Sequence, residues 1–249
     1  MIVIKSQEDI RTMREGGAIL AEVLHEVARH AVPDADTLSL DRMAQDLLVA
    51  RGGTPAFKGY QGYPASLCVS INNEVVHGIP SREKKLRDGD VVGLDLGVLY
   101  KGFYTDMAVT VGVGKVSRTA RRLIEVTRQA LERGLRKVRA GATLGDIGNA
   151  VQSFVEKKGF GVVRSLVGHG VGTEVHEDPP VPNYGEAGTG AVLKAGMTLA
   201  IEPMVTVGDY AVSTLDDQWT VITDDGSLAA HFEHTIAVTE RGYEILTRS

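Results

Sequence analysis

Two aspartates within one short stretch are the first residues whose types and spacing could do chemistry. Asp95 and Asp106 lie within residues 91–111, where two runs rich in Val, Leu and Thr flank a short turn, as in a β-hairpin. A turn centred between Tyr100 and Lys101 would place the two carboxylates directly opposite each other on one face. Like charges paired across a hairpin are destabilising. The two groups therefore share a proton, share a cation, or lie on a solvated face where their repulsion is weak.

Two glutamates and a histidine further along the chain extend this set of potential metal ligands. Glu202 lies within the otherwise apolar residues 199–205, Glu233 begins a strand-like run, and His169 lies in a Gly-rich segment. If the two halves of the chain face each other, four buried carboxylates converge and need counter-charge, which two divalent cations would supply. Oxygen ligands with one nitrogen suit Mn, Fe, Co or Zn. Such a pair of ions, about 3.5–4 Å apart, holds a bridging hydroxide for hydrolysis.

Helix pairs and strands alternate along the chain and must position these residues. Four helices are predicted, over about residues 6–31, 37–52, 117–138 and 143–159. Ser6 and Thr143 each precede an aspartate at capping-box spacing, and Ser117 is a further predicted cap. Pro33 follows the predicted end of the first helix, and glycines end the other three. A Gly- and Tyr-rich loop and strand-like runs separate the two pairs of helices.

The order of elements in the first half of the chain returns in the second half. His77-Gly78-Ile79 corresponds to His169-Gly170-Val171, and each half then carries two strand carboxylates. We therefore expect a duplicated helix-helix-strands unit, although the halves share few identical residues and chance similarity is the alternative. The pseudo-repeats would cover roughly residues 1–112 and 113–249 and form a single catalytic domain, residues 1–249.

Composition limits the class of protein to which the chain belongs. Its 249 residues are 43% hydrophobic, which is enough for a proper core. The net charge of −5 without a long basic run argues against nucleic acid as a partner. Cys68 is the only cysteine, which excludes a disulfide framework and a thiolate metal site within the chain. Because there is neither a signal-peptide pattern nor a membrane-spanning run, we expect a cytoplasmic protein without membrane contact.

Six motifs together give the whole chain a resemblance to the bacterial type I methionine aminopeptidases. The motifs are His77-Gly78-Ile79-Pro80, Asp95 with Asp106, Gly168-His169-Gly170-Val171-Gly172, Val175-His176-Glu177-Asp178-Pro179, Ala200-Ile201-Glu202-Pro203-Met204 and His231-Phe232-Glu233-His234-Thr235. The resemblance implies an α+β pita-bread fold, with a curved and mainly antiparallel sheet. Two helix pairs would cover its outer face, with pseudo-two-fold symmetry.

The resemblance also implies a set of ligands for two divalent metal ions. One ion would be held by Asp106, His169, Glu202 and Glu233, and the other by Asp95 with the bridging Asp106 and Glu233. The ions would lower the pKa of a bridging water that attacks the first peptide bond, while Glu202 passes a proton to the leaving nitrogen. The implied activity is co-translational removal of the initiator methionine from nascent proteins when the second residue is small.

Two further histidines have roles in the family that do not involve metal binding. His176 would hydrogen-bond the developing oxyanion, and His77 would contact the new amine or the backbone of the following residue. From the sequence alone, both are also typical of structural loop histidines. Strand alternation places His231 on the face of Glu233, which leaves a supporting role beside the ligands open.

The resemblance points to a methionine pocket of mostly aromatic and polarisable side chains. Its residues would be Phe57, Tyr60, Tyr63, Cys68, Val175 and Trp219. Such side chains suit a thioether, although an ordinary aromatic core cluster is the alternative for Phe57 and Tyr60. Phe57 stands where many bacterial members have cysteine, and Val175 stands where an aromatic residue is common.

Two alternatives remain open at the level of sequence. A prolidase or Xaa-Pro aminopeptidase would share the fold, but those enzymes usually carry an extra amino-terminal domain, whereas this chain begins with the catalytic unit. A metal-free pita-bread binding protein would have lost ligand residues, whereas all five are present here. The expected partners are the N-terminal Met of nascent polypeptides and, transiently, the ribosome. We expect a monomer with no nucleic acid substrate.

Overall fold

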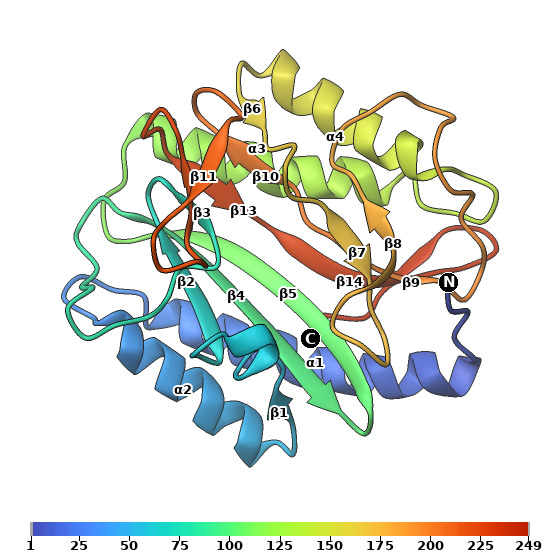
Figure 1. Ribbon diagram of the computed structural model, residues 1–249, viewed down its shortest axis with the longest axis horizontal. Coiled ribbons are helices and arrows are strands. Elements are labelled where there is room, and N and C mark those ends of the chain that lie inside the picture. Colours follow the sequence, from blue (N-terminus) through green and yellow to red (C-terminus); the bar gives the residue numbers. More distant parts are fainter. Residues whose placement is uncertain (1, 249) are drawn as a thin grey trace.

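The structure, a computed structural model, describes residues 2–248 as an antiparallel sheet flanked by helices (Figure 1). The α-helices of the described residues are α1 (Gln7–Arg29), α2 (Thr37–Ala50), α3 (Arg118–Leu135) and α4 (Leu144–Lys157), with a 3-10 turn at Tyr60–Gly62. The strands of the first half are β1 (Thr54–Pro55), β2 (Leu67–Ile71), β3 (Glu74–Val76), β4 (Val91–Tyr100) and β5 (Phe103–Gly112). Those of the second half are β6 (Gly161–Val162), β7 (Gly168–Gly170), β8 (Glu177–Val181), β9 (Thr198–Ile201), β10 (Met204–Thr206), β11 (Val212–Thr214), β12 (Val221–Thr223), β13 (Ala229–His231), β14 (Glu233–Val238) and β15 (Tyr243–Ile245).

The main sheet is built outward from a central pair of strands, β5 and β14. Its nine strands follow the order β1-β4-β5-β14-β9-β7-β8, with β2 also paired to β4 and β15 to β14. All these pairs are antiparallel. From the centre, each half continues through its own strand, β4 or β9, to an earlier strand of the same half, β2 or β7. This order confirms the predicted α+β architecture and is the arrangement that a duplicated unit requires.

Side-chain caps set the beginnings of the four helices. Ser6, Ser117 and Thr143 cap α1, α3 and α4, as their positions in the sequence predict. The cap of α2 is Asp36, whose carboxylate accepts a hydrogen bond of 2.9 Å from the backbone N–H of Ser39. Each helix ends two or three residues before its predicted end, because the chain already turns before the proline or glycine that was taken as the stop signal.

The turn of the β4–β5 hairpin lies one residue further along the chain than predicted. Lys101 and Gly102 both have positive φ, 48° and 87°, which is the conformation of a two-residue turn that matches the twist of the strands. Tyr100 pairs with Phe103. A turn centred between Tyr100 and Lys101 is therefore wrong, because the backbone adopts positive φ at a lysine that the sequence pattern does not mark.

The shifted turn changes which residues face the two aspartates but not the face on which they lie. Asp95 pairs with Ala108 and Asp106 with Gly97, so the prediction that the aspartates directly oppose each other is wrong. Because the turn moves by one residue, the pairing between the two strands changes by two residues, and each side chain stays on its predicted face. The two carboxylates are diagonal neighbours on one face, and the residue directly opposite each of them is small.

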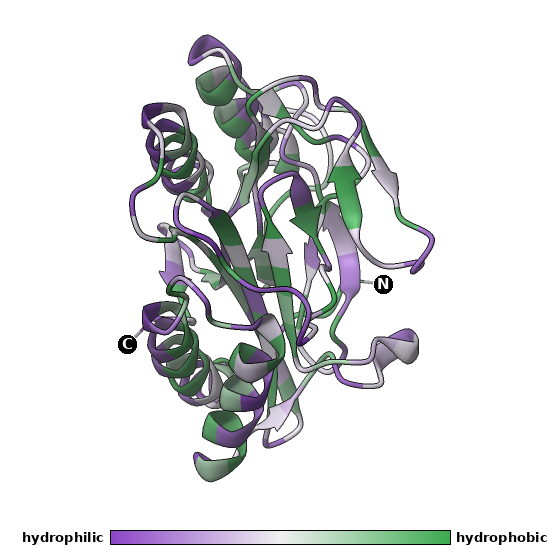
Figure 2. Ribbon diagram, turned by 90° about the vertical axis from the view of Figure 1, so that its left-hand side faces the viewer, coloured by the Kyte–Doolittle hydropathy of each residue, from purple (hydrophilic) through white to green (hydrophobic). Residues whose placement is uncertain are grey.

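The four helices cover one face of the sheet and bury the apolar core there (Figure 2). Leu24 of α1 and Leu48 of α2 join Leu94 of β4 in one fully buried cluster. Ile147 of α4 joins Ile201 of β9 in another. Each such side chain contributes about 1.5–3 kcal/mol through burial, so the helices anchor the strands whose opposite face carries the acidic residues. No helix within residues 2–248 has the length and apolar character needed to cross a membrane.

Candidate metal centre and substrate cavity

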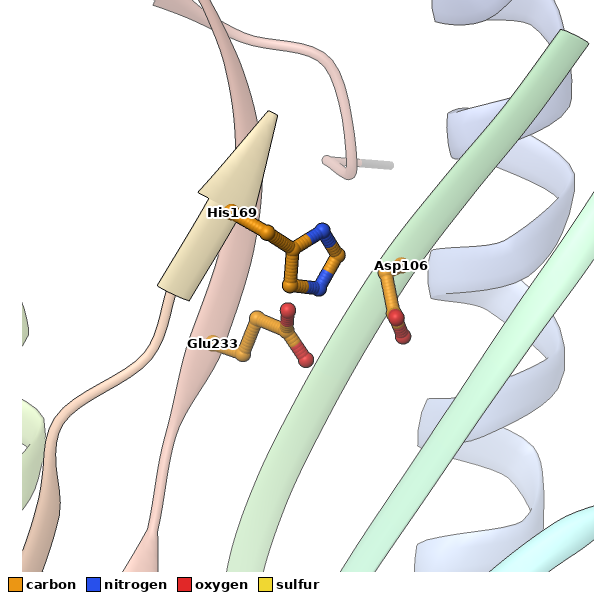
Figure 3. Close-up of side chains that lie close together, drawn as sticks. All are labelled: Asp106, His169 and Glu233. Atoms are coloured by element: carbon orange, nitrogen blue, oxygen red, sulfur yellow. The ribbon is translucent and has the colours of Figure 1, made fainter. Parts of the chain in front are cut away.

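Asp106, His169 and Glu233 point toward one another from three strands of the main sheet (Figure 3). Asp106 lies on β5, His169 on β7, and Glu233 begins β14. One ligand atom of each residue lies within 4.8 Å of the ligand atoms of the other two, and all three residues are buried. Two carboxylates and an imidazole at this spacing are a donor set that can hold a divalent cation.

Asp95 and Glu202 lie beside these three residues and line the same cavity. Asp95 comes from β4, and Glu202 directly follows the end of β9. The structure therefore brings together, from strands of both halves, all five residues that were predicted as metal ligands. Their convergence depends on the central β5–β14 pair, which places the β4–β5 pair of one half beside the β9–β14 pair of the other.

Two threonines hold the central strands together near the acidic residues. The hydroxyl of Thr235 accepts a hydrogen bond from the backbone N–H of Asp106 (2.8 Å) and donates one to the carbonyl of Asp106 (2.9 Å). The hydroxyl of Thr110 donates to the carbonyl of His231 (2.7 Å) and accepts from its N–H (2.9 Å). These four buried bonds fix the backbone at two points along the site, so the side chains between them have little freedom to separate.

Three buried carboxylate oxygens at the site have no hydrogen-bond partner among the described residues. They are Oδ1 of Asp95, Oδ1 of Asp106 and Oε1 of Glu233. Burial raises the pKa of Asp95 to about 6. Burial and the neighbouring aspartate charge raise the pKa of Asp106 and that of Glu233 well above their ordinary values. Because unpaired buried oxygens are rare and costly, and a cation would satisfy them and offset their repulsion, these residues fit divalent metal ions.

Glu202 lies between two histidines. Its Oε1 is 3.6 Å from Nε2 of His169, and its Oε2 is 3.4 Å from Nε2 of His231. Burial is the largest single influence and acts to raise the pKa of Glu202, but His231 and His169, together with His77, outweigh it, and the net pKa is lowered. The amide of Asn183 donates to the backbone carbonyl of Glu202 (3.0 Å) and holds the chain after β9. Glu202 is therefore an ionised carboxylate with both oxygens facing imidazole nitrogens.

His77 and His176 line the cavity beside the ligands. The ring of His176 lies 4.2 Å from that of His169 between centroids, and its Nδ1 is 2.9 Å from the hydroxyl of Tyr60. Partial desolvation and the neighbouring His169 lower the pKa of His176 to about 4. Burial lowers the pKa of His77 as well. Both imidazoles are thus neutral near pH 7 and can donate one N–H each to a bound molecule.

The cavity beside the acidic residues has a volume of about 210 Å³ and a largely apolar lining. Of the residues predicted for a methionine pocket, those that line it are Phe57, Tyr60, Tyr63, Cys68 and Trp219. The rings of Tyr63 and Trp219 meet edge to face at 5.1 Å between centroids. Val175 is buried, with 3% of its surface exposed, but it does not belong to the described lining, and its place in a pocket stays a prediction.

Sequence reasoning did not identify several other residues of the cavity. They are Gln61, Val76, Leu166, Val167 and Met204. Each lies within three residues of a predicted site residue along the chain, which is the signal that could have found them. A supporting role for His231 was left open, but its contact with Glu202 was not predicted. Strand alternation shows on which face a side chain lies and does not show which residue it contacts.

Comparison with known proteins agrees with this geometry. Residues 11–240 match the model of metallopeptidase family M24. The methionine aminopeptidase of Clostridium perfringens is 49% identical over 247 residues, which are 99% of each chain. The crystal structure of the methionine aminopeptidase from Thermotoga maritima is similar with a TM-score of 0.98 at 47% identity, and the match covers 100% of both chains.

A prolidase from Pyrococcus furiosus shares the fold but is much less similar in sequence. It matches with a TM-score of 0.79 at 24% identity, over 99% of this chain and 66% of the prolidase. That likeness extends to the pita-bread architecture alone, whereas the likeness to the methionine aminopeptidases extends over the whole chain in both sequence and structure. Family, fold and an acidic site suited to metal ions therefore agree, and the chain belongs to metallopeptidase family M24, among its methionine aminopeptidases.

Proposed function

We propose that this chain removes the N-terminal methionine from polypeptides by metal-assisted hydrolysis of the first peptide bond. The observation that carries the proposal is the set of unpaired buried carboxylate oxygens on Asp95, Asp106 and Glu233, next to an apolar cavity of about 210 Å³. The first feature suits cations and the second suits one medium-sized apolar side chain. The relatives named methionine aminopeptidase support this choice of substrate.

Two divalent ions per chain, of Mn, Fe, Co or Zn, are the proposed cofactors. Asp106, His169, Glu202 and Glu233 would hold one ion, and Asp95 with Asp106 and Glu233 would hold the other. When bound, the ions would act as Lewis acids that lower the pKa of a water for attack on a peptide carbonyl. The unpaired oxygens of both aspartates and of Glu233 support a site for more than a single ion.

Glu202 is the proposed carrier of the proton. It is ionised, it lines the cavity, and its two oxygens face His169 and His231. It can therefore accept a proton from the attacking water and deliver it to the nitrogen of the leaving amine. Glutamine at this position would keep the shape of the side chain and lose this function.

The two cavity histidines are proposed to bind the substrate around the reacting carbonyl. With the Tyr60 hydroxyl donating to Nδ1, His176 carries its proton on Nε2 and can donate it to the developing oxyanion. His77, also neutral, would contact the new amine or the backbone of the second residue. Tyr63, Cys68 and Trp219 would surround the methionine side chain. Burial raises the pKa of the Cys68 thiol, so this side chain stays protonated and uncharged and suits an apolar neighbour.

The wider setting of this activity is also part of the proposal. The substrates would be nascent chains with a small second residue, met in the cytoplasm during a transient contact with the ribosome, and the enzyme would act as a monomer. We also propose that residues 1–112 and 113–249 are pseudo-repeats of one catalytic domain, which the symmetric strand order supports.

Peptide specificity tests the proposal directly. Release of the first amino acid is measured from peptides beginning Met-Ala, Met-Lys and Ala-Pro, with protein loaded with Mn²⁺. We expect rapid release of methionine from Met-Ala, much slower release from Met-Lys, and no release of alanine from Ala-Pro. Preferential cleavage of Ala-Pro would instead indicate a prolidase-type or Xaa-Pro enzyme, and binding of Mn²⁺ without any cleavage would overturn the proposed activity.

A further inference from the structure

A buried ion pair joins the start of the chain to the segment that carries His176. The ammonium of Lys5 contacts the Oε2 of Glu177, and only 2% and 7% of the two side chains are exposed. The residues are 172 positions apart in the sequence, and Lys5 precedes the first helix. A pair this deeply buried requires close geometry, because both charges lose their hydration.

The other oxygen of Glu177 accepts hydrogen bonds from the residues that lead to His176. Its Oε1 accepts hydrogen bonds from the backbone N–H of Thr173 (2.6 Å), from the hydroxyl of Thr173 (3.1 Å) and from the N–H of Glu174 (3.3 Å). One carboxylate thus binds the beginning of the 172–177 segment on one side and Lys5 on the other. His176 lies within this closed segment, directly before Glu177 in the sequence.

Backbone contacts fix Lys5 and the first residue of the same segment. The N–H of Lys5 donates to the carbonyl of Gly196 (2.8 Å), in the chain just before β9. The carbonyl of Gly172 accepts from the N–H of Tyr104 on β5 (2.7 Å). Gly172 also leaves the space that the Lys5 side chain fills, since a Cβ on this glycine would overlap the Cε of Lys5. The segment is therefore held by the sheet on one side and by the start of the chain on the other.

We propose that Lys5 is a positioning residue for catalysis, which acts through Glu177 to hold the 172–177 segment and so keeps His176 at the reacting carbonyl. The proposal rests on the role proposed above for His176. Its consequence is that the start of the chain belongs to the catalytic apparatus although Lys5 does not line the cavity among the described residues. Loss of the pair should therefore lower turnover, with little change in the binding of the methionine side chain.

The test combines Lys5→Met with His176→Ala. The hydrolysis of a Met-Ala peptide is measured with Mn²⁺-loaded protein, well below the temperature at which each variant unfolds. We expect Lys5→Met to lower kcat by about tenfold with KM within about twofold, because a transition-state contact is lost. In the His176→Ala background, Lys5→Met should have no further effect on kcat, since residues that act through each other are not additive.

Arg14→Met is the matched control. Arg14 on α1 also pairs with a residue distant in sequence, Glu244 on β15, but the two side chains are 44% and 38% exposed. This variant should leave kcat and KM unchanged. Glu177→Gln is the second test variant if Lys5→Met does not fold, because the amide can still accept the bonds from residues 173 and 174 while it loses the charge that pairs with Lys5.

The outcomes separate this proposal from the proposed function. An equal loss of kcat from Lys5→Met, or from Glu177→Gln, in the presence and absence of His176 would show a purely structural role and overturn the proposal. So would an unchanged kcat in either variant. If His176→Ala alone leaves kcat unchanged, the role assigned to His176 is wrong, and if the wild-type protein releases no methionine, the proposed function fails first.

Discussion

Replacement of Asp95 by asparagine in the metal-free protein tests whether the acidic cluster is tolerated only with bound cations. In the folded chain, burial raises the pKa of Asp95 to about 6, from an ordinary value of 3.8. Above about pH 4 the unfolded chain releases this proton while the folded chain keeps it. The stability of the metal-free protein therefore falls as the pH rises from about 4 to about 6, and it stays low above that range.

The size of the effect follows from the two pKa values of Asp95. At about 1.36 kcal/mol for each pH unit, the difference between 3.8 and about 6 corresponds to about 3 kcal/mol of lost stability. Asparagine has nearly the same shape and no charge. We therefore expect Asp95→Asn to raise the free energy of unfolding at pH 7.5, without metal, by up to about 3 kcal/mol, and the gain to shrink as the pH is lowered toward 4.

Urea unfolding in the presence of a chelator measures this gain at several pH values, and Mn²⁺ is then added to both proteins. Mn²⁺ should stabilise the wild-type chain strongly, because it binds only the folded state, and the variant much less. The exposed Asp216 provides the control, since Asp216→Asn should change stability by less than about 0.5 kcal/mol. A metal-free Asp95→Asn protein that is less stable than the wild type at pH 7.5 would refute the reasoning.

Three further predictions concern activity. Protein stripped of metal should release no methionine from a Met-Ala peptide, and Mn²⁺, Co²⁺ or Fe²⁺ should restore release; a full rate after thorough chelation would rule out the mechanism. His169→Ala and Glu202→Gln should each lower kcat at least about 100-fold, or about 2.7 kcal/mol, and a near-wild-type rate for either would mean that the site is misplaced. In Gly97→Ala, the new Cβ would lie 2.7 Å from Cε1 of Phe57 and 2.9 Å from Cβ of Ala56. Phe57 must then move in the cavity, so KM for the peptide should rise about tenfold, and an unchanged KM would exclude Phe57 from the methionine pocket.

Local signals in the sequence were sufficient for the helices and for the faces of the strands. Ser6, Ser117 and Thr143 cap helices where their positions predict, because a cap depends on residues within one turn of each other. Alternation alone placed Asp95 and Asp106 on the same face. The predicted faces survived the misplaced turn because the cross-strand pairing changed by two residues, which keeps the alternation. This is why the convergence of the acidic residues could be predicted.

Features that depend on exact backbone conformation or on distant partners could not be predicted. The hairpin register was missed because Lys101 adopts positive φ, which the residue type does not mark. The partner of His231 is Glu202, from another strand region, and the partner of Lys5 is Glu177. No spacing rule connects such residues, since their contact exists only after the sheet has formed.

Anomalous diffraction from crystals of the protein soaked in Mn²⁺ tests the central claim most directly. The claim is that the carboxylates gathered from both halves of the chain are stable together because they hold divalent cations. We expect two anomalous peaks about 3.5–4 Å apart, both within coordination distance of Asp106 and Glu233, with Asp95, His169 and Glu202 completing the ligands. The claim would be contradicted if crystals soaked in saturating Mn²⁺ showed no anomalous peak among these five residues, or if the five side chains pointed away from one another.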